Sequence, residues 1–272
     1  MTGSIPKLAR VLSIAGSDSG GGAGIQADIK TIAALGGYAA TAVTAITVQN
    51  TLGVSAVHVV PPGIVAAQIA AVLSDIGADA IKTGMLVDAA TIEAVAQALE
   101  AQGSDIPVIV DPVMVAKGGA KLLDERSIAA LKTFIRGRAM LITPNLAEAE
   151  VLTGRRIESV EAMRDALDAL LALGASAVLL KGGHLPGAEI VDIYADAQER
   201  REWRAAKLGT RHTHGTGCTL ASAIATSVAQ GLPLIAAIER SRAYVRRAIE
   251  TAPGLGQGHG PLNHGCISTT PK

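Results

Sequence analysis

Short aliphatic runs alternate with longer stretches of helical periodicity along almost all of this 272-residue sequence. Runs such as Val108 to Val113 and Ala177 to Lys181 are rich in β-branched and aliphatic residues, as buried strands are. The stretches between the runs repeat their apolar residues at the spacing of an amphipathic helix. This rhythm is typical of βαβ units. It predicts an α/β fold with a doubly wound, mostly parallel sheet and helices on both faces.

The pattern predicts strands at 8–15, 42–49, 54–60, 80–83, 108–113, 139–143, 177–181 and 190–195, with a further one at 202–208. It predicts helices at 23–35, 63–76, 89–102, 125–136, 146–152, 160–173, 218–230 and 233–251. No repeat of fixed period and no linker-like run divides the chain, so we expect a single domain over 1–264. Residues 254–272 lack periodicity, but their Gly-Pro cluster can fold back over a site. We expect 265–272 to be disordered.

Composition excludes several classes of protein. Lysine plus arginine equals aspartate plus glutamate at 24 each, which disfavours nucleic acid and anionic membrane surfaces as partners. We expect no signal peptide and no transmembrane helix, because the start of the chain has no apolar core and no apolar stretch approaches the roughly 20 residues of a span. The two cysteines, Cys218 and Cys266, are far apart and form no CxxC motif, so neither a disulfide framework nor a thiolate zinc site is indicated. A cytoplasmic location follows as the simplest expectation.

A glycine-rich turn, Gly16 to Gly24, follows the first predicted strand directly and precedes a helix. Glycines let the backbone approach a ligand and direct amides at it. A P-loop is excluded because no lysine follows until Lys30, and a dinucleotide fingerprint lacks its acidic residue, since no Asp or Glu lies between Asp28 and Asp75. The alternative is a turn that only needs positive φ angles. Three consecutive glycines beside two aspartates favour a ligand site.

A second constellation, His214-Gly-Thr-Gly-Cys-Thr219, precedes a helix of small residues. Free amides at a helix start form an electropositive pocket suited to a phosphoryl group in transfer. They also lower the pKa of a thiol, so Cys218 is predicted to be a thiolate near neutral pH that accepts a proton or attacks an electrophile. The structural alternative is a small buried cysteine that packs against the helix start.

Three further clusters follow predicted strands, at Asp111 to Met114, Thr143 to Glu148 and Lys181 to His184. Ligands of open α/β sheets gather at the carboxyl ends of strands. Within the second cluster, Asn145 and Glu148 are three residues apart at a helix start, so both side chains can help to hold Mg²⁺. Lys181 can meet a phosphate as a point charge.

These motifs strongly resemble those of the hydroxymethylpyrimidine and phosphomethylpyrimidine kinases of thiamine biosynthesis, within the ribokinase-like superfamily. The resemblance spans about residues 8 to 264. Its segments are Gly16 to Asp28 (GSDSGGGAGIQAD), Thr44 to Thr51 (TAITVQNT), Lys82 to Leu86 (KTGML), the three strand-end clusters and Thr213 to Thr219.

The resemblance implies a ribokinase-like fold in which the pyrimidine lies over the first glycine-rich loop and hydrogen-bonds the amide of Gln49. The other positions that match the family's ring site are Gly16, Asp18, Ala23, Met85 and Val113. Cys218 matches the cysteine that replaces the aspartate base of other ribokinase-like enzymes.

The resemblance also implies ATP and Mg²⁺ as cofactors. The positions matching the family's ATP and metal sites are Asp111, Asn145, Glu148 and Lys181, and those of its anion hole run from Thr213 through Gly215 and Thr216 to Gly217. A homodimer is expected, since dimers are common among relatives. Two departures, Ser19-Gly20 in place of Pro-Ser and His212 in place of Asn, bear on loop mobility or ring preference.

The predicted activity is ATP-dependent phosphorylation of 4-amino-5-hydroxymethyl-2-methylpyrimidine and then of its monophosphate to the diphosphate. A pyridoxal or pyridoxine kinase is the nearest alternative, since relatives with the same cysteine loop accept that ring. From other classes, Cys218 is also compatible with the nucleophile of an acyl-transfer enzyme, with His214 as its base. A binding module that keeps the fold without turnover is a further alternative.

Overall fold

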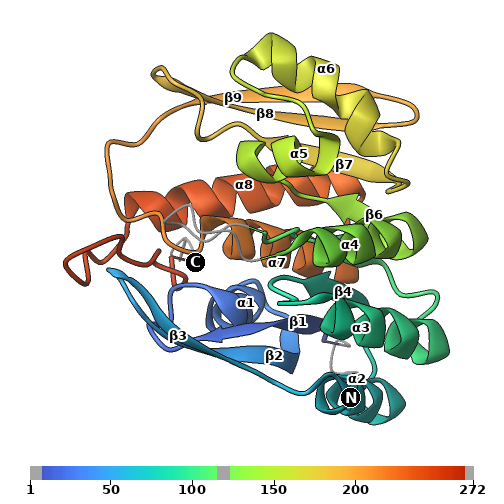
Figure 1. The fold of residues 1–272 in the computed structure, drawn as a ribbon. Helices are drawn as coiled ribbons and strands as arrows, with labels where there is room; N and C mark the ends of the chain where they lie inside the picture. Colours follow the sequence, from blue (N-terminus) through green and yellow to red (C-terminus); the bar gives the residue numbers. More distant parts are fainter. Residues whose placement is uncertain (1–7, 115–122, 267–272) are drawn as a thin grey trace, which may run out of the picture.

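The computed structural model describes residues 8–114 and 123–266, and a single nine-stranded sheet crosses its centre (Figure 1). The strand order is β3-β2-β1-β4-β5-β6-β7-β8-β9. The strands are β1 (Arg10–Asp18), β2 (Tyr38–Asn50), β3 (Gly53–Val59), β4 (Ala80–Thr83), β5 (Val108–Val110), β6 (Ala139–Ile142), β7 (Ala177–Lys181), β8 (Glu189–Asp196) and β9 (Arg200–Ala206). The strands from β2 through β1, β4, β5 and β6 to β7 pair in parallel, and β3, β8 and β9 are added antiparallel at the two edges.

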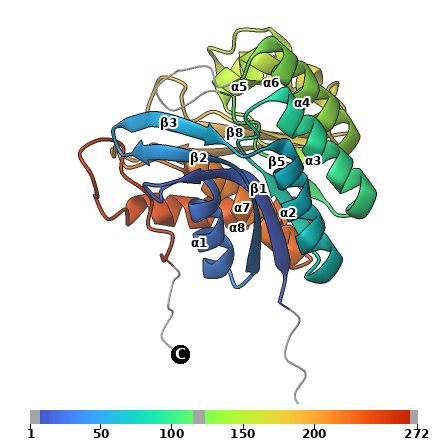
Figure 2. The ribbon, with the colours of Figure 1, turned by 60° about the horizontal axis from the view of Figure 1, so that its bottom comes forward.

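Helices cover both faces of the sheet, as expected for a doubly wound fold (Figure 2). They are α1 (Gly24–Ala34), α2 (Pro62–Asp75), α3 (Ala89–Gln102), α4 (Glu125–Arg138), α5 (Leu146–Thr153), α6 (Val160–Leu171), α7 (Thr216–Ala229) and α8 (Leu234–Glu250). Apolar side chains of α2 to α6 form one core with the sheet, and those of α1, α7 and α8 form a second core on the other face. Because β2 and β4 flank β1 on opposite sides, the chain reverses its direction across the sheet there, which is where ligands of such sheets bind.

Each predicted strand and helix is present, and the bounds that differ have local causes. Helix α7 begins at Thr216, two residues before the predicted start, because Gly215 takes a left-handed conformation (φ 83°) as its N-cap. Cys218 therefore lies inside the first turn of the helix. Strand β5 ends at Val110, before the predicted end, because Pro112 has no amide to donate and the amide of Val113 turns back onto the carbonyl of Asp111 at 2.8 Å.

The segment from residue 254 to 266 folds back over the loops near α7, although it forms no helix or strand. The amide of His259 donates to the carbonyl of Thr51 (2.9 Å), and the amide of His214 donates to the carbonyl of Gly260 (3.2 Å). Of the tail predicted to be disordered, Gly265 and Cys266 belong to the described part, and Cys266 is buried. Residues 267–272, like residues 1–7 of the predicted domain, lie outside the described residues.

Within 8–114 and 123–266, no helix combines the length and the apolar character that crossing a membrane would require.

Candidate active site

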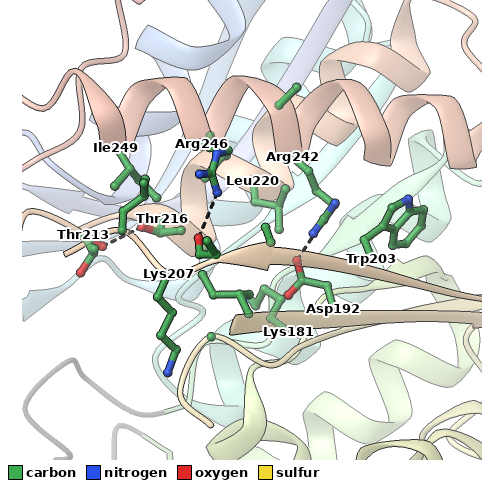
Figure 3. Close-up of a pocket in the computed structure, with 18 of the residues that line it drawn as sticks. Lys181, Asp192, Trp203, Lys207, Thr213, Thr216, Leu220, Arg242, Arg246 and Ile249 are labelled. Atoms are coloured by element: carbon green, nitrogen blue, oxygen red, sulfur yellow. Dashed lines mark hydrogen bonds and ion pairs between the residues drawn. The ribbon is translucent and has the colours of Figure 1, made fainter. Parts of the chain in front are cut away.

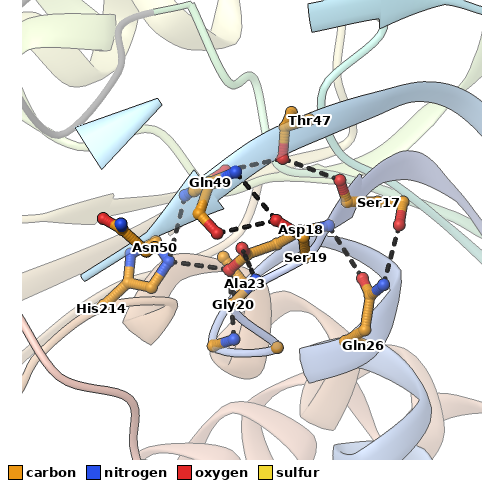
Figure 4. Close-up of polar contacts among 12 residues, drawn as sticks. Ser17, Asp18, Ser19, Gly20, Ala23, Gln26, Thr47, Gln49, Asn50 and His214 are labelled. Carbon is orange, nitrogen blue, oxygen red and sulfur yellow. Dashed lines mark hydrogen bonds and ion pairs between the residues drawn. The ribbon is translucent and has the colours of Figure 1, made fainter. Parts of the chain in front are cut away.

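Asp18, at the end of β1, organises the first glycine-rich loop (Figure 4). Its carboxylate accepts hydrogen bonds from the amides of Gly20 (2.8 Å), Gly22 (3.1 Å) and Ala23 (2.8 Å). Burial raises the pKa of Asp18, but His214 and the amides of Ala23 and Gly20 outweigh that effect, so the pKa lies below its usual value. The aspartate is therefore ionised at neutral pH and fixes the loop that was predicted to lie beneath the ring.

Gln49, the predicted partner of the pyrimidine, lies at the end of β2 beside this loop (Figure 4). Its Oε1 accepts a hydrogen bond from the Thr47 hydroxyl at 3.0 Å, and its Nε2 is 3.2 Å from Nε2 of His214. The same histidine nitrogen is 2.9 Å from Oδ2 of Asp18. The two glycine-rich segments thus meet at His214, which sequence reasoning considered only as the base of a cysteine nucleophile.

Three further residues of the predicted ring site are Gly16, Met85 and Val113, and the first two are in direct contact. Met85 packs on Gly16 so closely that a Cβ atom at Gly16 would lie 2.5 Å from the terminal methyl carbon of Met85. The carbonyl of Met85 accepts a hydrogen bond from the Thr44 hydroxyl at 2.6 Å. Val113 is half-buried in the segment after β5. Gly16 and Met85 are therefore in contact, and their role in binding a ring stays a prediction.

The second glycine-rich segment contacts the first through its backbone. A Cβ atom at Gly215 would lie only 1.8 Å from the carbonyl oxygen of Gly22. The first backbone hydrogen bond of α7 runs from Thr219 to Gly215 at 2.9 Å, so the amides of Gly217 and Cys218 precede the helical ladder. The Thr216 hydroxyl donates to the carbonyl of Thr213 at 2.8 Å and braces the turn. An electropositive helix start therefore lies directly beside the first loop.

Lys181 and Asp111 form an ion pair against this helix start. Nζ of Lys181, at the end of β7, is 2.9 Å from Oδ1 of Asp111, which follows β5. A Cβ atom at Gly217 would lie 3.2 Å from that Nζ and 3.3 Å from the other Asp111 oxygen, so a larger residue would have to displace the ion pair by a few tenths of an ångström. Burial lowers the pKa of Lys181, but the negative charges of Asp111 and Glu148 together raise it by more than burial lowers it. The lysine therefore stays charged.

Asn145 and Glu148 form a capping box at the start of α5. The amide of Glu148 donates to Oδ1 of Asn145 (3.0 Å), and the amide of Asn145 donates to Oε2 of Glu148 (2.8 Å). Burial raises the pKa of Glu148 to about 7, with Lys181 opposing and Asp111 adding to the rise. A second carboxylate near Asp111 is thus held where a cation would relieve their repulsion, and oxygen ligands of this kind suit Mg²⁺. Across 8–114 and 123–266, no three His, Cys, Asp or Glu side chains gather as a metal cluster.

The thiol of Cys218 contradicts one expectation. The sequence predicted a lowered pKa, but burial raises the pKa of this thiol to about 11. Lys82 and a hydrogen bond from the Gly24 amide act in the opposite direction, and Asp28 and Asp111 add to the rise. Cys218 is only half-buried by surface area, but the protein packed around its sulfur removes enough water to keep the thiol protonated in this structure.

A cavity of about 700 Å³ opens beside the start of α7 (Figure 3). Five of its lining residues were predicted to lie near ATP, namely Asn145, Lys181, Thr213, Thr216 and Gly217. Its apolar lining residues include Ile190 on β8, Trp203 on β9, Leu208 just after β9, and Val245 and Ile249 on α8. Arg242 lies over the Trp203 ring, 5.3 Å from its centroid, and donates to Asp192 at 2.9 Å. The cavity therefore joins an apolar chamber to the predicted phosphate site.

Sequence reasoning missed the residues of this chamber and a buried network below Cys218. The chamber residues come from three separate elements, and no motif links them. The sequence placed Lys82 only within the motif Lys82 to Leu86. A lysine inside the short buried strand Ala80–Thr83 already indicated a buried charge that needs a partner. Its side chain is fully buried and pairs with Asp28.

The chain is similar to known proteins of one enzyme family. The family model described as phosphomethylpyrimidine kinase matches residues 18–263. A hydroxymethylpyrimidine/phosphomethylpyrimidine kinase of Rhizobium meliloti is 50% identical over 93% of this chain and 96% of its own length. A thiamine biosynthesis bifunctional protein, ThiED, of Geobacter sulfurreducens is 53% identical over 93% of this chain. The present chain spans about half of it, 52% of its length.

Solved structures share the fold. The pyridoxal kinase of Staphylococcus aureus, in complex with AMP-PCP and pyridoxal, superposes with a TM-score of 0.88 and is 34% identical over 97% of this chain and 96% of its own. The doubly wound sheet with helices on both faces is therefore the ribokinase-like fold that the resemblance implied.

Proposed function

This chain belongs to the phosphomethylpyrimidine kinase family and is a phosphotransferase, and on that premise we propose that it phosphorylates 4-amino-5-hydroxymethyl-2-methylpyrimidine and then its monophosphate. The observation that carries the proposal is the meeting of the two glycine-rich loops at His214, with Gln49 on one side and Cys218 and Lys181 on the other. A ring held by the first loop would present its hydroxymethyl group toward the start of α7.

We assign Cys218 as the group that accepts the hydroxymethyl proton. In the transfer, the O–H proton passes to the thiolate sulfur, the oxygen forms a bond to the γ-phosphorus, and the bond to the β-phosphate oxygen breaks to release ADP. The amides of Gly215, Thr216 and Gly217 and the ammonium of Lys181 are arranged to stabilise charge on the moving phosphoryl group. Burial favours the protonated thiol, which cannot accept a proton. The proposed role therefore requires nearby positive groups, such as Lys82, to stabilise the thiolate.

ATP use rests on the family and on the nucleotide analogue in the S. aureus neighbour. The cavity in Figure 3 suits the nucleotide, because its apolar side chains on β8, β9 and α8 can pack on a base and its lining also includes Lys181, Asn145, Thr213 and Gly217. Asp111 is placed to keep Lys181 aimed at the phosphates through their 2.9 Å ion pair.

Asp111, Asn145 and Glu148 would hold Mg²⁺ together with phosphate oxygens and water. When bound, the ion would neutralise charge on the β- and γ-phosphates. The raised pKa of Glu148 supports this assignment, since a buried carboxylate close to Asp111 is one that a cation stabilises.

We also propose that the chain forms a homodimer through the hairpin of β2 and β3, whose exposed apolar side chains lie on both of its faces. Each residue of β3 is exposed, and this hairpin carries the exposed apolar side chains Ile46, Val48, Leu52, Val54, Val57 and Val59. Apolar patches of this kind mark interaction sites on soluble proteins. A second copy is the simplest partner, and a monomer in sedimentation equilibrium at micromolar concentration would contradict the assignment.

The unpaired state of Cys218 and Cys266 supports a cytoplasmic location.

The test of the function is ADP release from ATP with three compounds, namely the hydroxymethylpyrimidine, its monophosphate and pyridoxal. We expect turnover of the pyrimidine and its monophosphate to exceed that of pyridoxal. Preference for pyridoxal would instead establish the pyridoxal kinase alternative, which the S. aureus neighbour motivates. No ADP release with any compound would indicate a binding module, and an acyl adduct on Cys218 by mass spectrometry would indicate acyl transfer.

A further inference from the structure

A fully buried ion pair lies beneath the start of α7. Nζ of Lys82, on β4, is 3.0 Å from Oδ1 and 2.9 Å from Oδ2 of Asp28, on α1, and both side chains have no exposed surface. The Ser13 hydroxyl donates to Oδ2 at 2.6 Å, and the Ser222 hydroxyl donates to Oδ1 at 2.7 Å. The Asp28 carboxylate thus accepts from one ammonium and two hydroxyl groups.

Ser222 connects this pair to the helix that carries the candidate base. Ser222 follows Cys218 by four residues in α7, so the two side chains lie on one face of the helix, one turn apart. The amide of Gly24, the first residue of the helix that carries Asp28, lowers the pKa of the Cys218 thiol, so the start of α1 acts on the same sulfur. A Cβ atom at Gly84 would lie 2.9 Å from Nζ of Lys82, so a side chain there would displace the ammonium from its present position.

Stability alone explains the pair poorly. Burying two charges costs more free energy than their attraction returns unless the geometry is favourable, and apolar replacements of buried pairs are often neutral or stabilising. The negative member is compensated by two serines as well as by Lys82. An ammonium has three N–H donors, and the two contacts to Asp28 use at most two of them, so at least one N–H is not needed by the carboxylate.

We propose that Lys82, held in place by Asp28, Ser13 and Ser222, is a positioning residue that stabilises the thiolate of Cys218 during proton transfer. This inference rests on the proposed role of Cys218. Lys82 keeps its proton throughout, and the hydroxymethyl proton ends on the sulfur. The charged groups that act on Cys218 come from four places: Lys82 on β4, Asp28 on α1, Asp111 after β5 and Lys181 at the end of β7. Lys82 is the one with the strongest favourable effect on the thiolate.

The test is the pH dependence of alkylation of Cys218 by iodoacetamide, followed by peptide mass spectrometry so that Cys266 is counted separately. The double variant Lys82→Met/Asp28→Asn removes both charges and leaves no unpaired ion. We expect the alkylation midpoint to rise by about one pH unit or more and turnover at pH 7 to fall about 10-fold, with partial recovery at higher pH. KM for ATP and for the pyrimidine should stay within about threefold.

Arg10→Met/Asp79→Asn is the matched control, since this ion pair (2.7 Å) also joins the sheet to a neighbouring segment but is partly exposed. It should leave the midpoint unchanged. Ser222→Ala removes one hydrogen bond to the Asp28 carboxylate. The less compensated carboxylate should raise the alkylation midpoint of Cys218 by a smaller amount. This variant decides the question if the double variant does not fold.

If the folded Lys82→Met/Asp28→Asn variant keeps the alkylation midpoint of the wild type, the role of Lys82 is overturned. If that variant does not fold, an unchanged midpoint in Ser222→Ala overturns it. If Cys218→Ala keeps full turnover, the base assignment fails instead. The two failures are therefore distinguishable.

Discussion

Gln49 and His214 are 165 residues apart in sequence, yet their Nε2 atoms lie 3.2 Å apart at the mouth of the candidate ring site. The same His214 nitrogen lies 2.9 Å from Oδ2 of Asp18. One ring nitrogen either carries a proton or does not, so it can donate to Asp18 or accept from the amide of Gln49. Since Asp18 is ionised, donation to Asp18 leaves the Gln49 amide available for a ligand.

Gln49→Leu should weaken binding of the pyrimidine because the ring loses its amide partner. We expect KM for the hydroxymethylpyrimidine to rise about 10-fold to 100-fold, the cost of an unpaired polar group, with a smaller change in kcat. Steady-state kinetics at saturating ATP measure this effect. The matched control is Gln102→Leu at the exposed end of α3, which should leave KM unchanged. Equal KM values for the wild type and Gln49→Leu would remove Gln49 from the ring site.

Gly215→Ala should disrupt the contact between the two glycine-rich loops. A methyl group there would meet the carbonyl of Gly22 at 1.8 Å, in addition to the strain of φ 83°. We expect a loss of about 3 kcal/mol or more in unfolding free energy and a loss of turnover.

Gly231→Ala separates the two causes, because Gly231 has a similar φ of 86° but a Cβ atom there would meet nothing within 4 Å beyond its chain neighbours. That variant should cost only about 1 kcal/mol and keep turnover. Urea unfolding and ADP release measure both quantities. If the two variants lost equal stability, the contact with Gly22 would be unimportant.

His264 should make the domain less stable in mild acid. Its side chain is buried, its Nε2 is 3.0 Å from the Thr219 hydroxyl in the first turns of α7, and burial lowers its pKa to about 4. The unfolded chain takes up this proton near pH 6.5, so the stabilisation is complete above that pH and is lost as the pH falls toward 4. Between pH 7 and 5 the loss is on the order of 2 kcal/mol.

His264→Gln should lack this part of the pH dependence in urea titrations at pH 7 and 5. His58→Gln, at an exposed position of β3, is the control and should behave as the wild type does. A slope that survives in His264→Gln would assign the acid sensitivity to another group.

The order of elements and most of the candidate site were predictable because they depend on local patterns. Apolar periodicity defines the strands and helices, and the glycine-rich segments at strand ends and helix starts bring Asp18, Asp111, Lys181 and Gly217 to one edge of the sheet. That edge is where the parallel strands end, so motifs far apart in sequence meet there without any further information.

The ionisation of Cys218 was not predictable, because it depends on burial by elements that are distant in sequence. A helix start alone lowers the pKa of a thiol, but the depth of α7 in the domain raises it to about 11. The apolar residues that line the cavity and the hydrogen-bond network of Lys82 were not predicted for a related reason. Their members, such as Trp203 and Asp28, come from separate elements and meet only in the folded chain.

The central claim is that Cys218 accepts the substrate proton, and single-turnover phosphoryl transfer by Cys218→Ala tests it most directly. With ATP and the hydroxymethylpyrimidine bound at saturating concentrations, we expect the transfer rate of the variant to fall about 100-fold or more, while the dissociation constants of both ligands change little. A variant that transfers the phosphoryl group at the rate of the wild type would contradict the account.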